Sequence, residues 1–354
     1  MNIRYDKFLW EHLKSTDKPI VMYGMGNGAD KILAVAERYG VEIKDFFASD
    51  GFVRGHLFHG KRVLSYSEAK EKYGDMIVLL SFASSLPDVM ANFYRISSEC
   101  EFYAPDVPVF GNILFTPELV KANIDKIEAV YDMLSDERSK EIYENVINYK
   151  LSGDISYLRV AESDENEVTP LIGAADFTSY ADLGAYTGDT VKKMLDVAPK
   201  TKRVIALEPD ARNFRKLTAY AESETRCKIE ARNLGAWSHR DTLFFDASGN
   251  RNANIGENKK GKTAEVDALD NILAGEDIDY IKYDVEGSEK EALLGTKITI
   301  EKYAPTLLVS LYHRSEDIFE LPLLVKDLCP DYKLYLRRFP YIPAWDLNLY
   351  AIKK

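Results

Sequence analysis

The sequence predicts an α/β protein in which two Rossmann-like units are joined by a helical segment. Residues 19–39 and 179–197 each combine a buried strand, a glycine turn and an amphipathic helix. This order is typical of doubly wound α/β sheets, in which a ligand lies where a strand ends and a helix begins. Between the two units, apolar residues recur at helical spacing over residues 116–153. The expected parts are an N-terminal unit (1–112), a helical connector (113–165) and a C-terminal unit (166–354).

Length and composition limit the classes of protein that fit the chain. Its 354 residues are enough for two domains, and contents of 46% hydrophobic and 29% charged residues are typical of a soluble globular protein. The net charge of −11 argues against a general nucleic-acid binder. Three scattered cysteines suggest a reducing compartment without a disulfide framework. We recognise neither a signal peptide nor a membrane-spanning run, so we expect a cytoplasmic protein.

The N-terminal unit begins with an apolar run at residues 19–23, which the turn Gly-Met-Gly-Asn-Gly follows at residues 24–28. Further strands are expected at residues 41–48 and 76–81, and Asp50 lies just after the first of these two. Two interpretations stay open. The glycines and Asp50 could bind a nucleotide sugar or a similar ligand, or the glycines could serve only tight packing between strand and helix.

The connector carries clear helix signals. Thr116 and Pro117 are typical of the cap and the first position of a helix, and Gly153 is typical of a helix end. We expect these helices to pack on the C-terminal unit and to form one wall of its cleft. The alternative is that they act only as a spacer.

The C-terminal unit contains the most informative turn, Asp182-Leu-Gly-Ala-Tyr-Thr-Gly-Asp189. Its spacing differs from those of dinucleotide-binding turns and P-loops. Glu208 follows Gly188 by 20 positions, which is close to the offset at which an acid binds ribose hydroxyls. An acid at the start of the turn would repel a phosphate chain, whereas it suits the cationic end of S-adenosylmethionine. The turn therefore predicts a site for a nucleoside of this kind.

A second group of charged residues follows the expected strand at residues 280–285. Lys282, Asp284 and Glu286 alternate along the chain, so they share one face at the edge where open α/β sheets bind ligands. Helix capping explains Glu289, which opens the next helix, but it does not explain an acid inside a buried strand. We therefore predict a functional role for Asp284, with Lys282 as its partner.

His313 ends a further apolar run, at residues 306–312. A histidine that faces the same cleft as Asp284 could act as a general base near neutral pH, and a structural role is equally open. A metal bound by Asp284 and Glu286 could instead lower the pKa of the acceptor. Because two carboxylates are too few ligands to indicate a metal, none is predicted.

Three other features of the C-terminal unit complete the expectation. The polar stretch at residues 248–262 is expected to be a mobile loop, either over the site or at a hairpin tip. Trp237 could stack on a base, although a core position is favoured. Residues 331–339 and 347–352 are expected to form an antiparallel pair of strands.

Five stretches together resemble the FkbM-type methyltransferase family, over about the second half of the chain. The Lys-x-Asp-x-Glu-Gly-x-Glu pattern at residues 282–289 is the most specific of them, and Tyr186 stands where many members would have Asn or a small residue. The stretches are Asp182-Leu-Gly-Ala-Tyr-Thr-Gly-Asp189, Leu207-Glu-Pro-Asp210, Val266-Asp-Ala-Leu-Asp270, Ile281-Lys-Tyr-Asp-Val-Glu-Gly-Ser-Glu289 and Leu311-Tyr-His-Arg314.

This resemblance implies S-adenosylmethionine as the methyl donor, an oxygen acceptor on a sugar, glycan or natural product, and a seven-stranded class I methyltransferase sheet with an antiparallel last strand. Glu208 would meet the ribose, and the region of Asn233 would lie near the adenine. The catalytic residues facing the acceptor would be Asp284, Glu286 and His313. The residues implied at the donor are Asp182, Gly184, Ala185, Gly188, Asp189, Glu208, Pro209, Asn233 and Asp284.

The first hundred residues resemble, with lower specificity, the N-terminal domain of sugar-modifying acyltransferases and related carbohydrate enzymes. Residues 50–64 carry this resemblance. The leading prediction is an S-adenosylmethionine-dependent O-methyltransferase with a small-molecule or saccharide acceptor. The alternative is a nucleotide-binding or nucleotide-sugar-binding protein, or an oxidoreductase, that uses the N-terminal glycine turn and carries an inactive methyltransferase-like domain.

Overall fold

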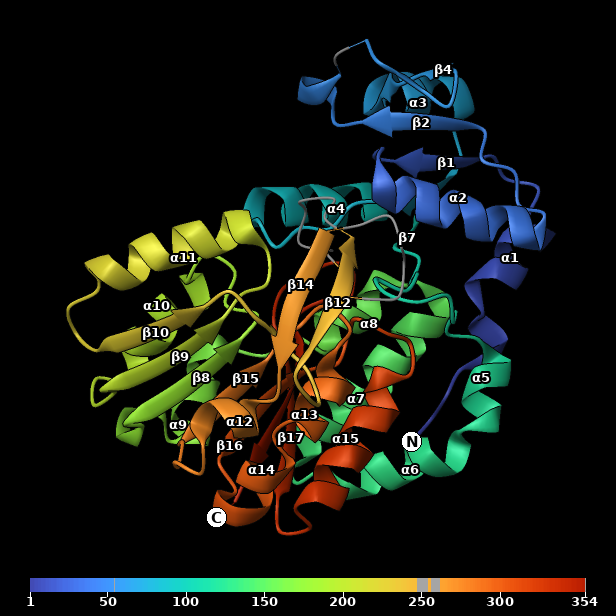
Figure 1. The fold of residues 1–354 in the computed structure, drawn as a ribbon. Coiled ribbons are helices and arrows are strands. Elements are labelled where there is room, and N and C mark those ends of the chain that lie inside the picture. Colours follow the sequence, from blue (N-terminus) through green and yellow to red (C-terminus); the bar gives the residue numbers. More distant parts are fainter. Residues whose placement is uncertain (54, 247–253, 256–261, 354) are drawn as a thin grey trace.

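A computed structural model describes residues 1–53, 55–246, 254–255 and 262–353. Figure 1 shows one sheet at the top of the molecule, a larger sheet below it, and green connector helices beside the larger sheet. The loop expected at residues 248–262 lies outside the described residues, apart from 254–255 and 262. Within the described ranges, no helix is long and apolar enough to cross a membrane.

Five parallel strands form the N-terminal sheet, in the order β5-β2-β1-β6-β7. The central strands β1 and β6 are uncharged apolar runs that are buried throughout, as expected for a sheet covered on both faces. Its strands are β1 (Ile20–Tyr23), β2 (Asp45–Ala48), β5 (Leu64–Ser65), β6 (Ile77–Leu80) and β7 (Glu101–Tyr103), with a hairpin of β3 (Leu57–Phe58) and β4 (Lys61–Arg62). Its helices are α1 (Leu9–Ser15), α2 (Asn27–Tyr39), α3 (Tyr66–Tyr73) and α4 (Pro87–Glu99).

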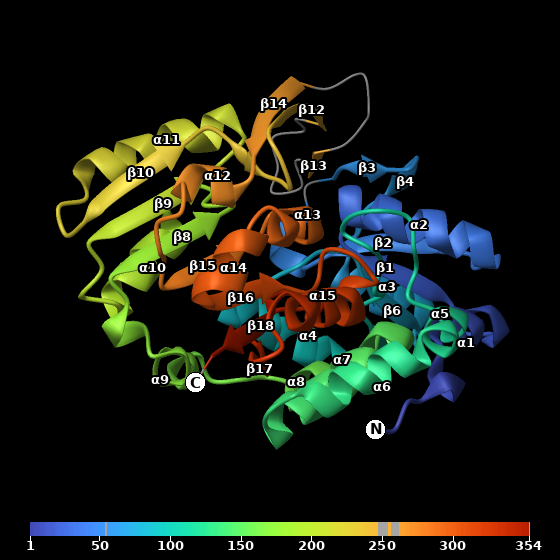
Figure 2. The ribbon, with the colours of Figure 1, turned by 60° about the horizontal axis from the view of Figure 1, so that its bottom comes forward.

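The connector consists of α5 (Pro117–Ala122), α6 (Ile124–Met133), α7 (Glu137–Ser152) and α8 (Ile155–Val160). Both helix signals in the sequence are confirmed. The Thr116 hydroxyl accepts the N–H of Leu119, and Gly153 ends α7 with a φ of 66°. Figure 2 shows α6 and α7 beside the red C-terminal elements.

Seven strands form the C-terminal sheet, in the order β10-β9-β8-β15-β16-β18-β17. β18 runs antiparallel to both of its neighbours, and this confirms the predicted sheet with a reversed last strand. The strands are β8 (Ser179–Leu183), β9 (Arg203–Leu207), β10 (Lys228–Arg232), β15 (Tyr280–Tyr283), β16 (Thr306–Ser310), β17 (Lys333–Arg338) and β18 (Leu347–Ile352). The helices are α9 (Val168–Ile172), α10 (Asp189–Val197), α11 (Ala211–Ser223), α12 (Leu269–Leu273), α13 (Glu289–Leu294), α14 (Lys297–Tyr303) and α15 (Asp317–Leu328).

A small four-stranded sheet lies beside the large one, in the order β11-β14-β12-β13. Trp237 packs there, partly buried, against Ala264 and Val266. The strands are β11 (Gly235–Ala236), β12 (Asp241–Asp246), β13 (Asn254–Ile255) and β14 (Lys262–Asp267).

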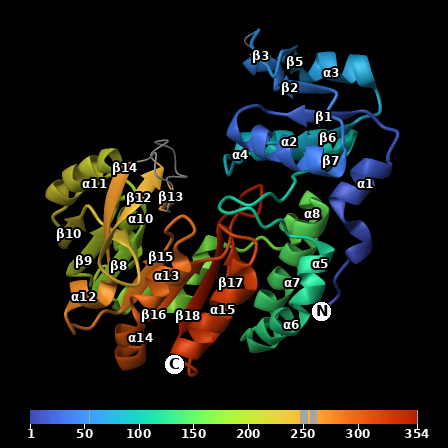
Figure 3. The same cartoon turned by 45° about the vertical axis from the view of Figure 1, so that its right-hand side comes forward.

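One continuous cluster of buried side chains joins the two halves of the chain. It includes Val78 of β6, Val146 of α7, Leu183 of β8 and Leu334 of β17. The connector also bonds to the edge of the large sheet, because the Ser135 N–H donates to the Leu334 carbonyl at 2.8 Å. In Figure 3 the connector helices lie below the N-terminal unit and beside the red elements.

Candidate active site

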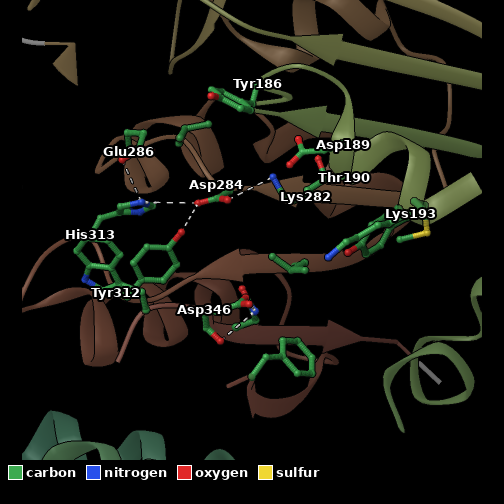
Figure 4. Close-up of a pocket in the computed structure, with 18 of the residues that line it drawn as sticks. Tyr186, Asp189, Thr190, Lys193, Lys282, Asp284, Glu286, Tyr312, His313 and Asp346 are labelled. Atoms are coloured by element: carbon green, nitrogen blue, oxygen red, sulfur yellow. Dashed lines mark hydrogen bonds and ion pairs between the residues drawn. The ribbon is translucent and has the colours of Figure 1, made fainter. Parts of the chain in front are cut away.

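The carboxyl ends of β8, β9 and β15 meet at a cavity of about 470 Å³. The strand order reverses beside β8, and ligands of open α/β sheets bind at such a point. Seven of the predicted site residues line this cavity, namely Gly184, Asp189, Glu208, Pro209, Asp284, Glu286 and His313. The structure therefore brings the predicted donor turn and the predicted acceptor residues to one space, shown in Figure 4.

The turn after β8 depends on one glycine. Gly184 has a φ of +88°, and a Cβ atom added there would lie 2.0 Å from the carbonyl oxygen of Asp284. Its N–H donates to the carbonyl of Leu207 at 3.0 Å, so the turn is fixed to the neighbouring strand. Tyr186 follows with a φ of +49°, a conformation that Asn adopts more easily than Tyr. Tyr186, which differs from the residue expected here, therefore has a strained backbone and lines the cavity.

Gly184→Ala is expected to lower the free energy of unfolding far more than Gly275→Ala. Both glycines have a φ of +88°, but nothing lies within 4 Å of a Cβ at Gly275. The control substitution should cost about 1–2 kcal/mol, from the φ angle alone. The backbone clash at Gly184 should add about 2 kcal/mol or more. Denaturant unfolding measures both costs, and equal losses would show that the turn moves aside without penalty.

Glu208 is held firmly at the end of β9. Its two carboxylate oxygens accept the N–H groups of Tyr186 and Asp210, at 2.9 and 2.8 Å. The residue is 6% exposed, and burial raises the pKa of Glu208 to about 7, with the charge of Asp210 acting in the same direction. Each oxygen keeps a lone pair, which can accept a hydroxyl of a ligand.

Donor affinity is expected to rise about tenfold between pH 6 and pH 8. With a pKa of about 7, Glu208 changes from mainly protonated to mainly ionised over this range, and the ionised form is the stronger hydrogen-bond acceptor. Because the folded pKa lies above the ordinary value, the contribution of Glu208 to stability is present below pH 4.5 and is lost as the pH rises through 7. Calorimetry with S-adenosylhomocysteine across this range measures the affinity, and a flat profile would contradict the expectation.

Four predicted donor residues do not line the cavity. Asp182 is fully buried, and its carboxylate accepts the Thr190 hydroxyl at 2.5 Å and the Lys282 ammonium at 3.1 Å. The Asn233 side-chain amide donates to the carbonyls of Glu208 and Pro209, and these hydrogen bonds stabilise the turn after β9. The residues outside the lining are Asp182, Ala185, Gly188 and Asn233.

Lys282 links two carboxylates at the ends of neighbouring strands, those of Asp182 and Asp284. Its ammonium lies 3.1 Å from Asp182 and 3.5 Å from Asp284, which confirms Lys282 as the partner of Asp284. Burial alone would lower the pKa of Lys282, but the two carboxylates raise it above its ordinary value. The Tyr312 hydroxyl donates to the other oxygen of Asp284 at 2.9 Å. Asp284 is therefore a half-buried carboxylate with partners on both oxygens.

His313 lies among three acids and is 1% exposed. Its Nδ1 is 2.9 Å from Glu289, and its Nε2 is 3.6 Å from Asp284 and 3.5 Å from Glu286. Burial would lower the pKa of His313, but the acids, Glu289 above all, raise it to about 10. With that pKa the ring is a cation at neutral pH and cannot accept a proton, so the role of general base does not fit this protonation state.

The lining also contains residues to which the sequence analysis gave no role. Lys193 and Asn213 come from α10 and α11, Tyr312 follows β16, and Tyr341 and Asp346 lie between β17 and β18. Helical spacing places Lys193 on α10, but it does not say which face of the helix meets the cavity. The connector helices α5 to α8 do not line the cavity, contrary to expectation, because α7 packs on the edge strand β17 and α6 packs on α15.

A second cavity, of about 300 Å³, lies at the N-terminal glycine turn. Gly28 and Lys31 of α2 line it, and its far wall contains Tyr341 and Trp345, which also line the first cavity. Asp50 takes no part, because its carboxylate accepts the hydroxyl and the N–H of Ser67, at 2.8 and 3.0 Å, at the start of α3.

Comparison with known proteins finds one family model that matches the second half of the chain. Residues 182–342 match the sequence profile described as the Methyltransferase FkbM domain. The fold is similar to that of a methyltransferase FkbM from Methylobacillus flagellatus KT, with 21% identity, 97% of this chain and 92% of that chain covered, and a TM-score of 0.72. No curated protein matches the sequence.

Other solved structures are similar over about half of the chain. Fibrillarin from Aeropyrum pernix, in complex with S-adenosyl-L-methionine, has 12% identity and a TM-score of 0.34, with 53% of this chain and 74% of that chain covered. An rRNA methylase from Streptococcus thermophilus has 13% identity and a TM-score of 0.37, with 54% and 97% covered. Residues 182–342 thus match the FkbM methyltransferase domain, and the protein is an S-adenosylmethionine-dependent methyltransferase.

Proposed function

We propose that the enzyme methylates a hydroxyl group of a sugar, glycan or natural-product acceptor. The observation that carries this proposal is a single cavity with two chemically different ends. One end has a glycine turn and the ribose-type acid Glu208, and the other has Asp284 and Glu286 among aromatic rings. A volume of about 470 Å³ is within the usual range for a site that holds small organic ligands.

The donor would lie against the turn after β8. Gly184 lets the backbone approach the amino-acid part of the donor, and Glu208 accepts the ribose hydroxyls with the lone pairs that its backbone partners leave free. Acids outnumber lysines in the lining, which suits a ligand with a sulfonium cation. Asp182 and Asn233 would support these walls without touching the donor.

The acceptor would lie between Asp284 and the loop that joins β17 to β18. Tyr312, Tyr341 and Trp345 offer aromatic faces, and Asp284 and Asp346 offer carboxylates. Rings pack against the C–H face of a saccharide, and carboxylates accept its hydroxyls, so this mixture fits a polyhydroxylated ligand. The proposal that the acceptor contains a sugar is based on these aromatic and acidic lining residues.

The donor supplies an electrophilic methyl group, which an acceptor oxygen attacks in line. The task of the chain is to hold the hydroxyl in position and to lower the cost of losing its proton. We assign the hydrogen bond from that hydroxyl to Asp284, because its carboxylate is fixed by Lys282 and Tyr312. His313, as a cation, would hold Asp284 and Glu286 in place.

A transfer assay tests the proposal. The protein is incubated with methyl-labelled S-adenosylmethionine and a panel of free saccharides, nucleotide sugars, glycosides and hydroxylated polyketides. We expect micromolar binding of S-adenosylhomocysteine in calorimetry, and label on an oxygen of a saccharide-containing acceptor. Label on nitrogen or carbon, or transfer only to acceptors that have no sugar, would contradict the acceptor class.

Nucleotide-sugar binding by the N-terminal unit is a second candidate function. The cavity of about 300 Å³ at residues 24–28, with Lys31 in its wall, favours it. The engagement of Asp50 with Ser67 removes the acid that was expected at the ribose. Calorimetry with UDP-glucose and NAD, on the wild type and on Lys31→Ala, tests this candidate. Absence of binding to the wild type would leave the glycines a packing role.

A further inference from the structure

The turn that carries Glu286 into the cavity wall has a left-handed backbone, with a φ of 55° at Glu286 and 91° at Gly287. A glutamate adopts this region only at a cost, so the turn keeps its shape only where neighbouring groups hold it. On the inner side, the N–H of Val285 donates to the Glu289 carboxylate at 2.9 Å. In Figure 4 the Glu286 side chain lies next to the His313 ring, 3.5 Å from its Nε2. The place of the Glu286 carboxylate therefore depends on what holds the turn.

On its outer side the turn meets residues 108–113, which lie between β7 and α5. A Cβ atom added to Gly287 would lie 2.8 Å from Cγ of Phe110, so the aromatic ring packs directly against the glycine. No side chain larger than hydrogen fits between them while the ring stays in place. The glycine of the turn therefore serves two purposes, because it allows the left-handed backbone and it leaves room for Phe110.

Arg314 connects the ring of Phe110 to the turn. Its guanidinium carbon lies 4.0 Å from the centre of the Phe110 ring, which is a cation–π distance, and its Nε donates to the carbonyl of Gly287 at 2.9 Å. The backbone N–H of Phe110 donates to the carbonyl of His313 at 2.8 Å. Phe110 therefore contacts both segments that follow β15 and β16, and these segments carry Glu286 and His313.

Residues 108–113 are themselves anchored at both ends. The Lys31 ammonium of α2 donates to the carbonyls of Pro108 and Val109, at 3.2 and 2.6 Å. The Ser315 hydroxyl donates to the carbonyl of Ile113 at 2.7 Å. Val109 is buried and lines the first cavity. The segment is therefore fixed between α2 and the large sheet, so it can hold the turn rather than yield to it.

We propose that Phe110 is a positioning residue for methyl transfer. Its ring and the Arg314 guanidinium hold the turn at Glu286 and Gly287, so that the Glu286 carboxylate stays at the acceptor end of the cavity. Phe110 does not line the cavity, so it acts through Glu286 and touches neither ligand. This inference rests on the proposed function, in which Asp284 and Glu286 form the acceptor end. A shift of about 1 Å in such a group can lower a reaction rate about 100-fold.

The pKa of His313 reports the position of Glu286 without any acceptor. Burial lowers this pKa, and the neighbouring acids Glu289, Glu286 and Asp284 raise it to about 10. In Phe110→Ala the turn is released and Glu286 moves away from the ring, so we expect the pKa of His313 to fall by about 1. Phe110→Tyr keeps an aromatic ring and should keep the pKa. NMR titration of the His313 ring protons, assigned with His313→Gln, measures it in the full-length protein.

Kinetics tests the consequence for the reaction, with an acceptor that the transfer assay has identified. Phe110→Ala is expected to lower kcat/KM for that acceptor about 10- to 100-fold, with the Kd of S-adenosylhomocysteine within about twofold of the wild type. Phe110→Tyr should restore most of the loss. The matched control is Tyr5→Ala, which also removes a ring beside a cation, since the Lys121 ammonium lies 5.3 Å from the centre of Tyr5. Tyr5 lines neither cavity, so this control should leave the kinetics and the pKa of His313 unchanged.

Three results would overturn the inference. Unchanged kcat/KM in a folded Phe110→Ala protein would make the contact one of packing alone. An unchanged pKa of His313 would show that Glu286 stays in place without the ring. An equal loss of donor affinity and of kcat/KM would mean a general loosening of the cavity. Melting temperatures check that each variant is folded.

The two readouts also separate this inference from the proposed function. If the wild type transfers methyl groups to none of the acceptors, the proposed function fails. The NMR titration needs no acceptor, so it still decides whether Phe110 holds the turn at Glu286.

Discussion

Glu208→Ala is expected to weaken binding of S-adenosylmethionine and S-adenosylhomocysteine at least 100-fold. The carboxylate is fixed by the N–H groups of Tyr186 and Asp210, so its free lone pairs are pre-oriented toward a ligand in the cavity. Two charge-assisted hydrogen bonds at about 1.5–3 kcal/mol each make this a loss of about 3–6 kcal/mol. Calorimetry with both ligands measures it.

The matched control for this substitution is Glu222→Ala. Glu222 is exposed on α11 and does not line the cavity, so its removal should leave donor affinity unchanged. The melting temperature of Glu208→Ala should not fall far, because Ala removes a buried acid that is costly when ionised. Full donor binding by a folded Glu208→Ala protein would remove this residue from the donor site.

Asp284→Asn is expected to lower turnover by about 10²–10³, while donor affinity stays within a few fold. Asparagine keeps the shape of the side chain and its acceptor oxygen for Tyr312, but it loses the charge that faces Lys282 and His313. Loss of one positioned group at the reacting hydroxyl typically costs this much. Single-turnover kinetics with saturating donor separates turnover from binding.

Asp331→Asn serves as the control for Asp284→Asn. Asp331 is an exposed acid before β17 and lines neither cavity, so its substitution should leave turnover unchanged. If Asp284→Asn lost donor affinity in proportion to turnover, Asp284 would belong to the donor site alone. Unchanged turnover would assign the acceptor hydroxyl to another group.

The sequence predicted the large sheet and the place of the site well, because both depend on local patterns. Apolar runs that end in an acid or a glycine marked β8, β9 and β15, and parallel strands necessarily bring such ends to one edge. Gly184, Glu208 and Asp284 could therefore be grouped without a structure. The two-residue strands and the pairing of the small sheet carry no comparable pattern, and they were not predicted.

The sequence could not predict which of the site residues line the cavity and which do not. Asp182 was expected at the donor, yet its oxygens are used by Thr190 and Lys282. The protonation of His313 was equally hidden, because it depends on Glu289 at the start of helix α13. Such outcomes follow from contacts between segments that are distant in sequence. The domain boundaries at residues 112 and 165 stay predictions.

The cluster of buried side chains that joins β6, α7, β8 and β17 has a consequence for how the chain melts. Neither sheet can lose its packing without exposing apolar surface of the other, because α7 contributes to both. The Arg337 guanidinium of the edge strand β17 also forms an ion pair with the Asp136 carboxylate at 2.7 Å, which links the connector to the large sheet. The two halves should therefore unfold in one cooperative transition. The chain then behaves thermodynamically as a single unit, although it contains two separate main sheets.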